Sequence, residues 1–141
     1  MKNLIQLCLV LMTMSISAQN NLKDGVAIQG YDPVAYFVEG KAVLGLKEIK
    51  TQYDNATYYF ATDVNKEEFV KNPDKFVPQY GGYCAYGLSK GYKAPIDPKA
   101  FTIVEDKLYL NYSLDVKAEW MKQREERIVK ANENWEKIKN K

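Results

Sequence analysis

The chain contains two cysteines, Cys8 and Cys84, and only Cys84 remains if the N-terminal segment is removed. Residues 1–18 have the pattern of a secretory signal. A positive residue opens the segment, residues 4–14 form an apolar run too short to span a bilayer, and small residues ending at Ala18 suit signal peptidase. We therefore expect an exported chain that cannot form an internal disulfide, so its fold must be held together by packing.

Residues 19–141 are enough for one ordinary domain with its own hydrophobic core. Twenty basic and eighteen acidic residues are interspersed, a pattern that favours neither nucleic acid nor an anionic membrane, and no membrane span is expected after signal removal. The chain has no histidine, so it lacks the commonest metal ligand, the usual general base and any Ser–His or Cys–His pair. An enzyme is therefore the least favoured class of function.

Two stretches have the alternating or aromatic-rich pattern of β-hairpins. Because the second turn lacks a glycine, we expect a three-residue or looser connection there. The predicted hairpins run from 46–53 to 57–60 through a turn at 54–56, and from 101–104 to 108–112 through a turn at 105–107.

Short helices are predicted beside these hairpins. Asp32 can cap a first helical turn that presents aromatic side chains to the core. A second helix should begin at residue 62 or 63 and end before Pro73, with Val64 and Phe69 facing inward. Two prolines should keep residues 91–98 irregular.

From Leu114 onward, apolar residues recur every seven positions, as in a long helix that docks through one narrow face. The repeat consists of Leu114, Met121, Ile128 and Trp135. We thus predict an α+β fold: a small antiparallel sheet of two hairpins, short flanking helices, and a long C-terminal helix laid across the sheet. The expected divisions are a signal peptide (1–18), an N-terminal lead (19–29), the main domain (30–113) and the C-terminal helix (114–141).

The segment from Pro78 to Gly87 holds Cys84 among tyrosines and glycines and is the candidate site. A thiolate with neighbouring phenol oxygens can bind a metal or a cofactor, and Asp54 could add a hard ligand if the fold brings it near. The candidate cofactor-binding residues are Tyr80, Tyr83, Cys84 and Tyr86, and the candidate metal ligands are Cys84 and Asp54. Two other interpretations of Cys84 stay open: a small buried hydrophobe, and a redox or covalent group.

Several segments together make the chain resemble the YHS-domain family. They are Gly30–Phe37, Tyr58–Ala61, Phe69 with Asn72–Phe76, Pro78–Ala85, and Leu108–Tyr112. Some members of that family carry a Tyr-His-Ser signature and a Phe-Cys-Ser-x-x-Cys segment, which suit soft metals such as copper or zinc. In this chain Asp54 follows Tyr53 where the histidine would be, and Ala61 and Asn65 stand at the two cysteine positions.

Two classes of function remain open. In the first, the chain is a non-catalytic accessory protein of a bacterial envelope, periplasmic or secreted. It would bind a metal ion such as copper, haem or another small ligand near residues 80–86, with Tyr53 and Asp54 close by. In the second, it is a structural or interaction module without a ligand, and its aromatic core and C-terminal helix present a surface to an envelope partner.

Overall fold

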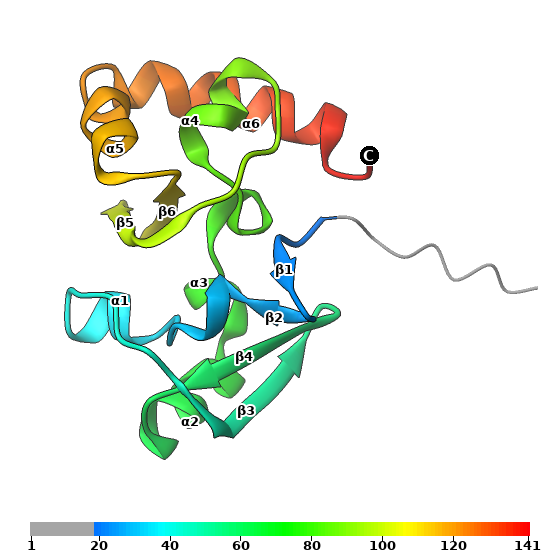
Figure 1. The fold of residues 1–141 in the computed structure, drawn as a ribbon, viewed down its shortest axis with the longest axis vertical. Coiled ribbons are helices and arrows are strands. Elements are labelled where there is room, and N and C mark those ends of the chain that lie inside the picture. Colours follow the sequence, from blue (N-terminus) through cyan, green and yellow to red (C-terminus); the bar gives the residue numbers. More distant parts are fainter. Residues whose placement is uncertain (1–18) are drawn as a thin grey trace, which may run out of the picture.

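The structure is a computed structural model that describes residues 19–141, so the predicted signal and Cys8 lie outside the described residues. The described chain forms two lobes (Figure 1). The first lobe contains β1 (Leu22–Lys23), β2 (Val26–Ala27), η1 (Ile28–Gly30), α1 (Ala35–Val38), β3 (Leu46–Tyr53), β4 (Ala56–Phe60), α2 (Asp63–Lys71) and α3 (Pro73–Phe76). A 3-10 turn, η2 (Gln79–Gly82), leads to the second lobe, which contains α4 (Ala85–Lys90), β5 (Asp97–Val104), β6 (Lys107–Asn111), α5 (Leu114–Met121) and α6 (Arg124–Ile138).

The predicted α+β class is confirmed, but the two hairpins lie in separate sheets. The first sheet has the order β1-β2-β4-β3, and β2 runs parallel to β4 where Val26 lies opposite Thr57. The second sheet is the β5–β6 pair. The predicted lead at 19–29 therefore contributes two strands, and each is only two residues long, too short for an alternating pattern to reveal.

Both hairpin turns contain two residues in the left-handed region of φ. Asp54 and Asn55 have φ values of 49° and 63°, which suits a tight primed turn at the predicted place. Glu105 and Asp106 have φ values of 49° and 60°, and Val104 pairs directly with Lys107. The expectation of a looser second turn was therefore wrong, because these two residues adopt positive φ without a glycine.

The predicted start of each short helix is confirmed. Asp32 Oδ1 accepts hydrogen bonds from the backbone N–H groups of Val34 and Ala35, at 2.8 and 3.2 Å. Thr62 Oγ1 accepts one from the backbone of Asn65 at 3.1 Å, and α2 ends before Pro73. Phe69 is buried as predicted. Val64 is 66% exposed, so its inward placement was wrong.

Helix α4 follows Cys84 directly and was not predicted, because Gly87 in its middle is a poor helix former. The glycine is needed there, since a Cβ at Gly87 would lie 3.1 Å from the backbone oxygen of Tyr92. The irregular segment after α4 is also shorter than predicted, because β5 begins at Asp97.

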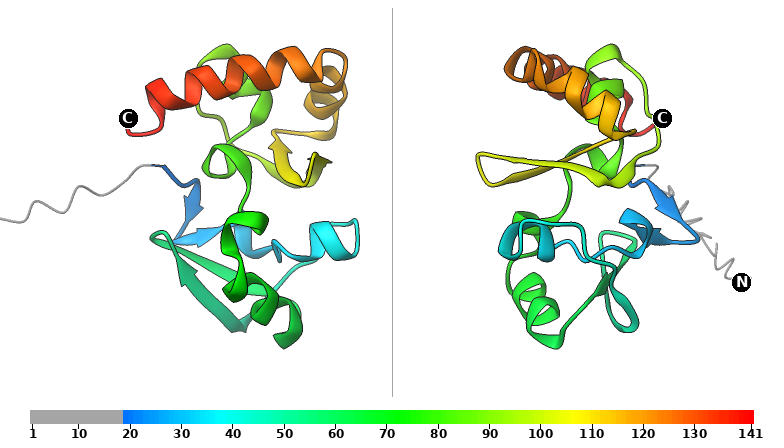
Figure 2. Two further views of the ribbon diagram at one scale, coloured as in Figure 1. Left: turned by 180° about the vertical axis from the view of Figure 1, so that it is seen from behind. Right: turned by 60° about the vertical axis from the view of Figure 1, so that its left-hand side comes forward.

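The predicted single C-terminal helix is divided into α5 and α6, with a break at Lys122 and Gln123. Helix α6 crosses α4 at the outer side of the second lobe, so it covers a helix and not the sheet (Figure 2). Trp120 is fully buried at this bend and anchors it. Leu114 and Met121 are 60% and 41% exposed, so the heptad pattern fails before the break.

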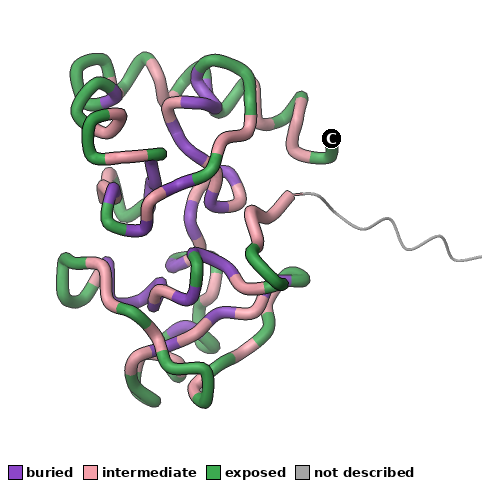
Figure 3. The backbone as a smooth tube through the Cα atoms, in the orientation of Figure 1, coloured by how far each residue is buried: buried purple, intermediate pink, exposed green. Residues whose placement is uncertain are grey.

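One hydrophobic cluster includes residues of both lobes. Figure 3 shows that the backbone linking the lobes is largely buried. At its centre, the Phe69 ring contacts the rings of Tyr58 and Phe60 at 4.8 and 5.2 Å between centroids. Leu108 and Leu110 of β6 belong to the same cluster. The lobes are therefore held in one relative position by shared apolar packing.

Candidate functional site

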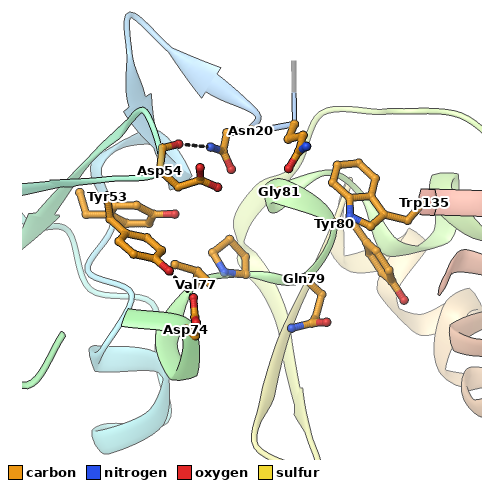
Figure 4. Close-up of a pocket in the computed structure, with 12 residues that line it drawn as sticks. Asn20, Tyr53, Asp54, Asp74, Val77, Gln79, Tyr80, Gly81 and Trp135 are labelled. Atoms are coloured by element: carbon orange, nitrogen blue, oxygen red, sulfur yellow. Dashed lines mark hydrogen bonds between the residues drawn. The ribbon is translucent and has the colours of Figure 1, made fainter. Parts of the chain in front are cut away.

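A cleft of about 190 Å³ lies where the two lobes meet, and we refer to it as the interlobe cleft (Figure 4). Figure 4 shows Tyr53, Asp54 and Asp74 on one side, and Tyr80 and Trp135 on the other. Its walls come from segments far apart in the sequence. They are Gln19, Asn20, Tyr53, Asp54, Tyr58, Asp74, Val77, Pro78, Gln79, Tyr80, Gly81 and Trp135.

The first-lobe wall carries two carboxylates. Asp54 sits at the β3–β4 turn, and its backbone oxygen accepts a hydrogen bond from the Asn20 side chain at 2.7 Å. The Asp54 carboxylate has no hydrogen-bond or ion-pair partner among residues 19–141. The carboxylate of Asp74 accepts a hydrogen bond from the Tyr53 hydroxyl. That bond is the main reason why the pKa of Tyr53 lies above its ordinary value.

Tyr58 places a phenol at the base of this wall. The residue is 3% exposed and packs on Phe69, yet it also lines the interlobe cleft. Its hydroxyl makes no hydrogen bond within the described part of the chain. Burial first, and then the negative charge of Asp54, raise the pKa of Tyr58 well above its usual range. The group therefore stays protonated, and it is free to bond a ligand.

The second-lobe wall is aromatic. Tyr80 has a φ of 58°, and its hydroxyl donates a hydrogen bond to Asn132 Oδ1 on α6 at 2.9 Å. Its ring lies 5.9 Å from that of Tyr109 and 6.2 Å from that of Trp135. Burial raises the pKa of Tyr80 well above its usual range, so this residue is a fixed neutral support for Trp135.

The first described residues close the cleft at its rim. Asn21 donates its backbone N–H to the Gly81 oxygen at 2.8 Å and its side-chain amide to the Gly82 oxygen at 3.2 Å. A Cβ on Gly81 would lie 1.7 Å from the Gln19 backbone oxygen, so only glycine permits this close approach. Residues 19–21 are thus packed against η2.

The predicted site residues are divided among three places. Tyr80 and Asp54 both line the interlobe cleft. Tyr83 packs on Trp135 beneath the Lys93 ammonium group. Cys84 and Tyr86 line a separate, largely apolar pocket of about 300 Å³. The structure thus brings Asp54 beside the tyrosine loop but does not bring it to Cys84.

Several residues that line the cleft were not predicted as site residues, and three of them carry functional groups of interest: Tyr58, Asp74 and Trp135. In the sequence, Tyr58 belongs to a predicted strand, Asp74 follows Pro73 after the second predicted helix, and Trp135 belongs to the heptad repeat. Their local patterns fit those assignments, so no signal in the sequence could have grouped them.

Cys84 behaves as a buried thiol. It is 1% exposed, and its Sγ donates a weak hydrogen bond to Asn111 Oδ1 at 3.4 Å. The same oxygen accepts the backbone N–H of Tyr86 at 3.0 Å, which fixes the start of α4 against β6. These contacts favour a packing role for the thiol.

We expect Cys84 to react with a maleimide at least about 100-fold more slowly in the folded protein than in urea, because the thiol becomes reachable only through local opening. Thiol labelling followed by mass spectrometry measures both rates. Comparable rates would show that the pocket beside Cys84 opens readily and would argue against a sealed thiol.

The donor set does not fit the metal site of the YHS members with cysteines. The backbone N–H of Ala61 and the side-chain amide of Asn65 both donate to Asp32 Oδ2, at 2.8 and 2.9 Å. Within residues 19–141, no three cysteine, aspartate or glutamate side chains are grouped so that they could hold a metal ion. Cys84 is also too buried to reach a haem iron without rearrangement. We therefore derive no metal or haem chemistry for this chain.

A pair of tyrosine variants tests whether the Tyr58 hydroxyl lacks a hydrogen-bond partner within residues 19–141. Tyr58→Phe should change the free energy of unfolding by less than about 0.5 kcal/mol, since no protein bond is lost. Tyr36→Phe should cost about 1–2 kcal/mol, because its buried hydroxyl donates to the Pro98 oxygen at 2.7 Å. Urea unfolding measures both, and equal losses would contradict the assignment.

The fold and the cleft define a small two-lobed α+β domain with a polar and aromatic cavity. Residues 34–80 match the model of the YHS domain. The match runs from the start of α1 to Tyr80, which covers most of the first lobe and both cleft carboxylates. Neither the comparison with curated proteins nor that with solved structures finds a match. Among the described helices, none has the length and apolar character required to cross a membrane.

Proposed function

We propose that this protein is an exported, non-catalytic accessory protein of the cell envelope that binds a small ligand in the interlobe cleft. The main support is that the cleft contains polar groups without protein partners, the Asp54 carboxylate and the Tyr58 hydroxyl, next to an aromatic wall. Sites for small ligands combine apolar walls with a few such placed polar groups. The volume is below the ~300–1,000 Å³ of sites for drug-sized molecules, so the ligand is small.

The cleft is favoured over the pocket beside Cys84. That pocket is lined almost entirely by apolar atoms, and its one thiol is bonded to Asn111. Among the described residues, those that line it expose little polar surface to orient a polar ligand. A role as a ligand-free interaction module takes second place, because the exposed apolar side chains of the described residues are distributed over elements of both lobes, from α1, β3 and α2 to α5 and α6. Examples are Val70, Met121 and Val129.

Export has its own test. If the signal ends at Ala18, the mature chain begins at Gln19, which is the first residue packed against Gly81. Intact-mass measurement of the protein recovered from the envelope or medium of expressing cells should give the mass of residues 19–141. A retained N-terminal segment would contradict export by this route.

The binding proposal is tested by NMR with the purified, isotope-labelled protein and a library of small polar fragments. It predicts at least one fragment whose chemical-shift changes are largest at the backbone amides of Asn20, Asp54 and Gly81. Changes centred on Cys84 and Tyr92, or no saturable binding by any fragment, would contradict it.

A further inference from the structure

We infer that the ligand of the interlobe cleft is a small organic cation: a primary ammonium or similar N–H-bearing group on a short apolar body. This inference rests on the proposed function, since it assigns the class of ligand for the same cleft. Its starting point is charge. Among residues 19–141, those that line the cleft include two carboxylates, Asp54 and Asp74, and no lysine or arginine.

One cation near the second-lobe wall, Lys93, bonds to the C-terminal end of the chain. The Lys93 ammonium lies 5.6 Å from the centre of the Trp135 ring, but it donates hydrogen bonds to the backbone oxygens of Lys139 and Lys141 at 3.1 and 3.0 Å. Lys93 does not line the cleft. Among residues 19–141, no cationic side chain at the walls of the cleft compensates the charge of Asp54 and Asp74, which favours a positive ligand. If the signal is removed at Ala18, the new N-terminus at Gln19 also lines the cleft, so binding is measured on residues 19–141.

The hydrogen-bonding groups match a donor-rich cation. The Asp54 carboxylate is an acceptor without a partner among residues 19–141. Asp74 uses one oxygen for the Tyr53 hydroxyl and keeps acceptor capacity on the other. The hydroxyl of Tyr58, 97% buried as a residue, is a further unused group beside them, and a phenol oxygen can accept an N–H. An ammonium group has three donors and no acceptor, which suits this set.

The remaining walls suit an apolar body that carries the charge. Tyr53, Tyr58 and Trp135 present aromatic surface, and Pro78 and Val77 add aliphatic surface. Aromatic faces attract cations, and the attraction grows when water is excluded. A neutral polar ligand would leave the two exposed carboxylates paired only with water, and an anion would be repelled.

A bare divalent cation fits less well. Calcium takes six to eight oxygen ligands and magnesium needs a nearly ideal octahedron, with carboxylates as the main contributors. This cleft offers two carboxylates, one of them already bonded to Tyr53, and no third acidic or thiol side chain is grouped with them in residues 19–141. The wall opposite them is aromatic and supplies no carboxylate.

The test compares three probes of one shape and different charge: benzylamine, benzyl alcohol and benzoate. Isothermal titration of the purified protein at low ionic strength should give a Kd for benzylamine at least tenfold lower than that for benzyl alcohol, and no binding of benzoate. The benzylamine affinity should fall as salt is added. Magnesium chloride is titrated as a separate arm and should not compete with benzylamine at equal concentration.

Matched variants test whether the preference for benzylamine comes from the residues of the cleft. Asp54→Asn removes the charge and keeps a residue that tolerates positive φ, so the turn is retained. It should weaken benzylamine binding at least tenfold, and Tyr58→Phe should weaken it several-fold. Asp106→Asn makes the same change at the other two-residue turn, away from the cleft, and should leave the affinity unchanged.

The outcomes separate this inference from the proposed function. If benzyl alcohol or benzoate binds the cleft as tightly as benzylamine, or if magnesium displaces it, the inference fails although the cleft remains a ligand site. The inference also fails if the fragments found by NMR to bind the cleft are neutral or anionic. If no probe and no fragment binds there, the proposed function fails with it.

Discussion

Asp32→Ala should lower the free energy of unfolding by about 4 kcal/mol, the largest effect we expect from one substitution outside the aromatic core. The Asp32 side chain is fully buried and accepts four hydrogen bonds. Two come from the backbone at the start of α1, one from the backbone of Ala61 and one from the side chain of Asn65. Its removal leaves four donors without this acceptor, two of them buried and two partly buried, and each buried donor costs about 1–3 kcal/mol if it stays dry.

Urea unfolding followed by circular dichroism measures this loss, and two controls define it. Glu67→Ala removes an exposed carboxylate from α2 and should change the free energy of unfolding by less than about 0.5 kcal/mol. Asp32→Asn keeps the shape of the side chain, but its NH₂ group would face N–H donors. It should therefore recover only part of the lost free energy of unfolding. A change of less than about 1 kcal/mol in Asp32→Ala would mean that water replaces the carboxylate, and that this network does not join α1 to α2.

Gly81→Ala should be the second large effect, with an expected loss of about 2–4 kcal/mol. The backbone at Gly81 has a φ of 59°, which costs an alanine roughly 1–2 kcal/mol. The new methyl group would also lie 1.7 Å from the Gln19 oxygen, so residues 19–21 must leave η2. The hydrogen bonds from Asn21 to the oxygens of Gly81 and Gly82 are then lost.

Gly40→Ala is the matched control, because Gly40 has a φ of 67° and nothing lies within 4 Å of an added Cβ. It should show the backbone cost alone, so the difference between the two variants measures the packing of residues 19–21. Hydrogen exchange at the Asn21 amide should become at least about tenfold faster in Gly81→Ala and stay unchanged in Gly40→Ala. Equal losses in both variants would contradict the docking of this segment.

The sequence predicted the elements whose signals are local. The alternating residues 46–53 and the aromatic-rich residues 57–60 located the first hairpin, and Asp32 and Thr62 located two helix starts. It did not predict how the hairpins are arranged, because β1 and β2 add to the first sheet through two-residue strands. Nor did it predict the bend at Lys122 and Gln123, because neither glycine nor proline interrupts the heptad pattern there. The fully buried Trp120 lies beside this bend.

The sequence predicted only part of the candidate site, because the cleft is built from segments far apart in the chain. Tyr80 and Asp54 were proposed as neighbours, and they share the interlobe cleft. Cys84 drew attention as the lone thiol, but its chain position places it one residue before α4, facing Asn111 and not Asp54. Trp135 reaches the cleft only because α6 folds back over α4. That long-range packing has no signature in local sequence.

The most direct test of the account is a crystal structure of the purified protein soaked with benzylamine at a saturating concentration. We expect ligand density in the interlobe cleft, with the amine within hydrogen-bond distance of the Asp54 carboxylate and the ring against Trp135. Ligand density in the apolar pocket beside Cys84, with the cleft filled only by water, would contradict it.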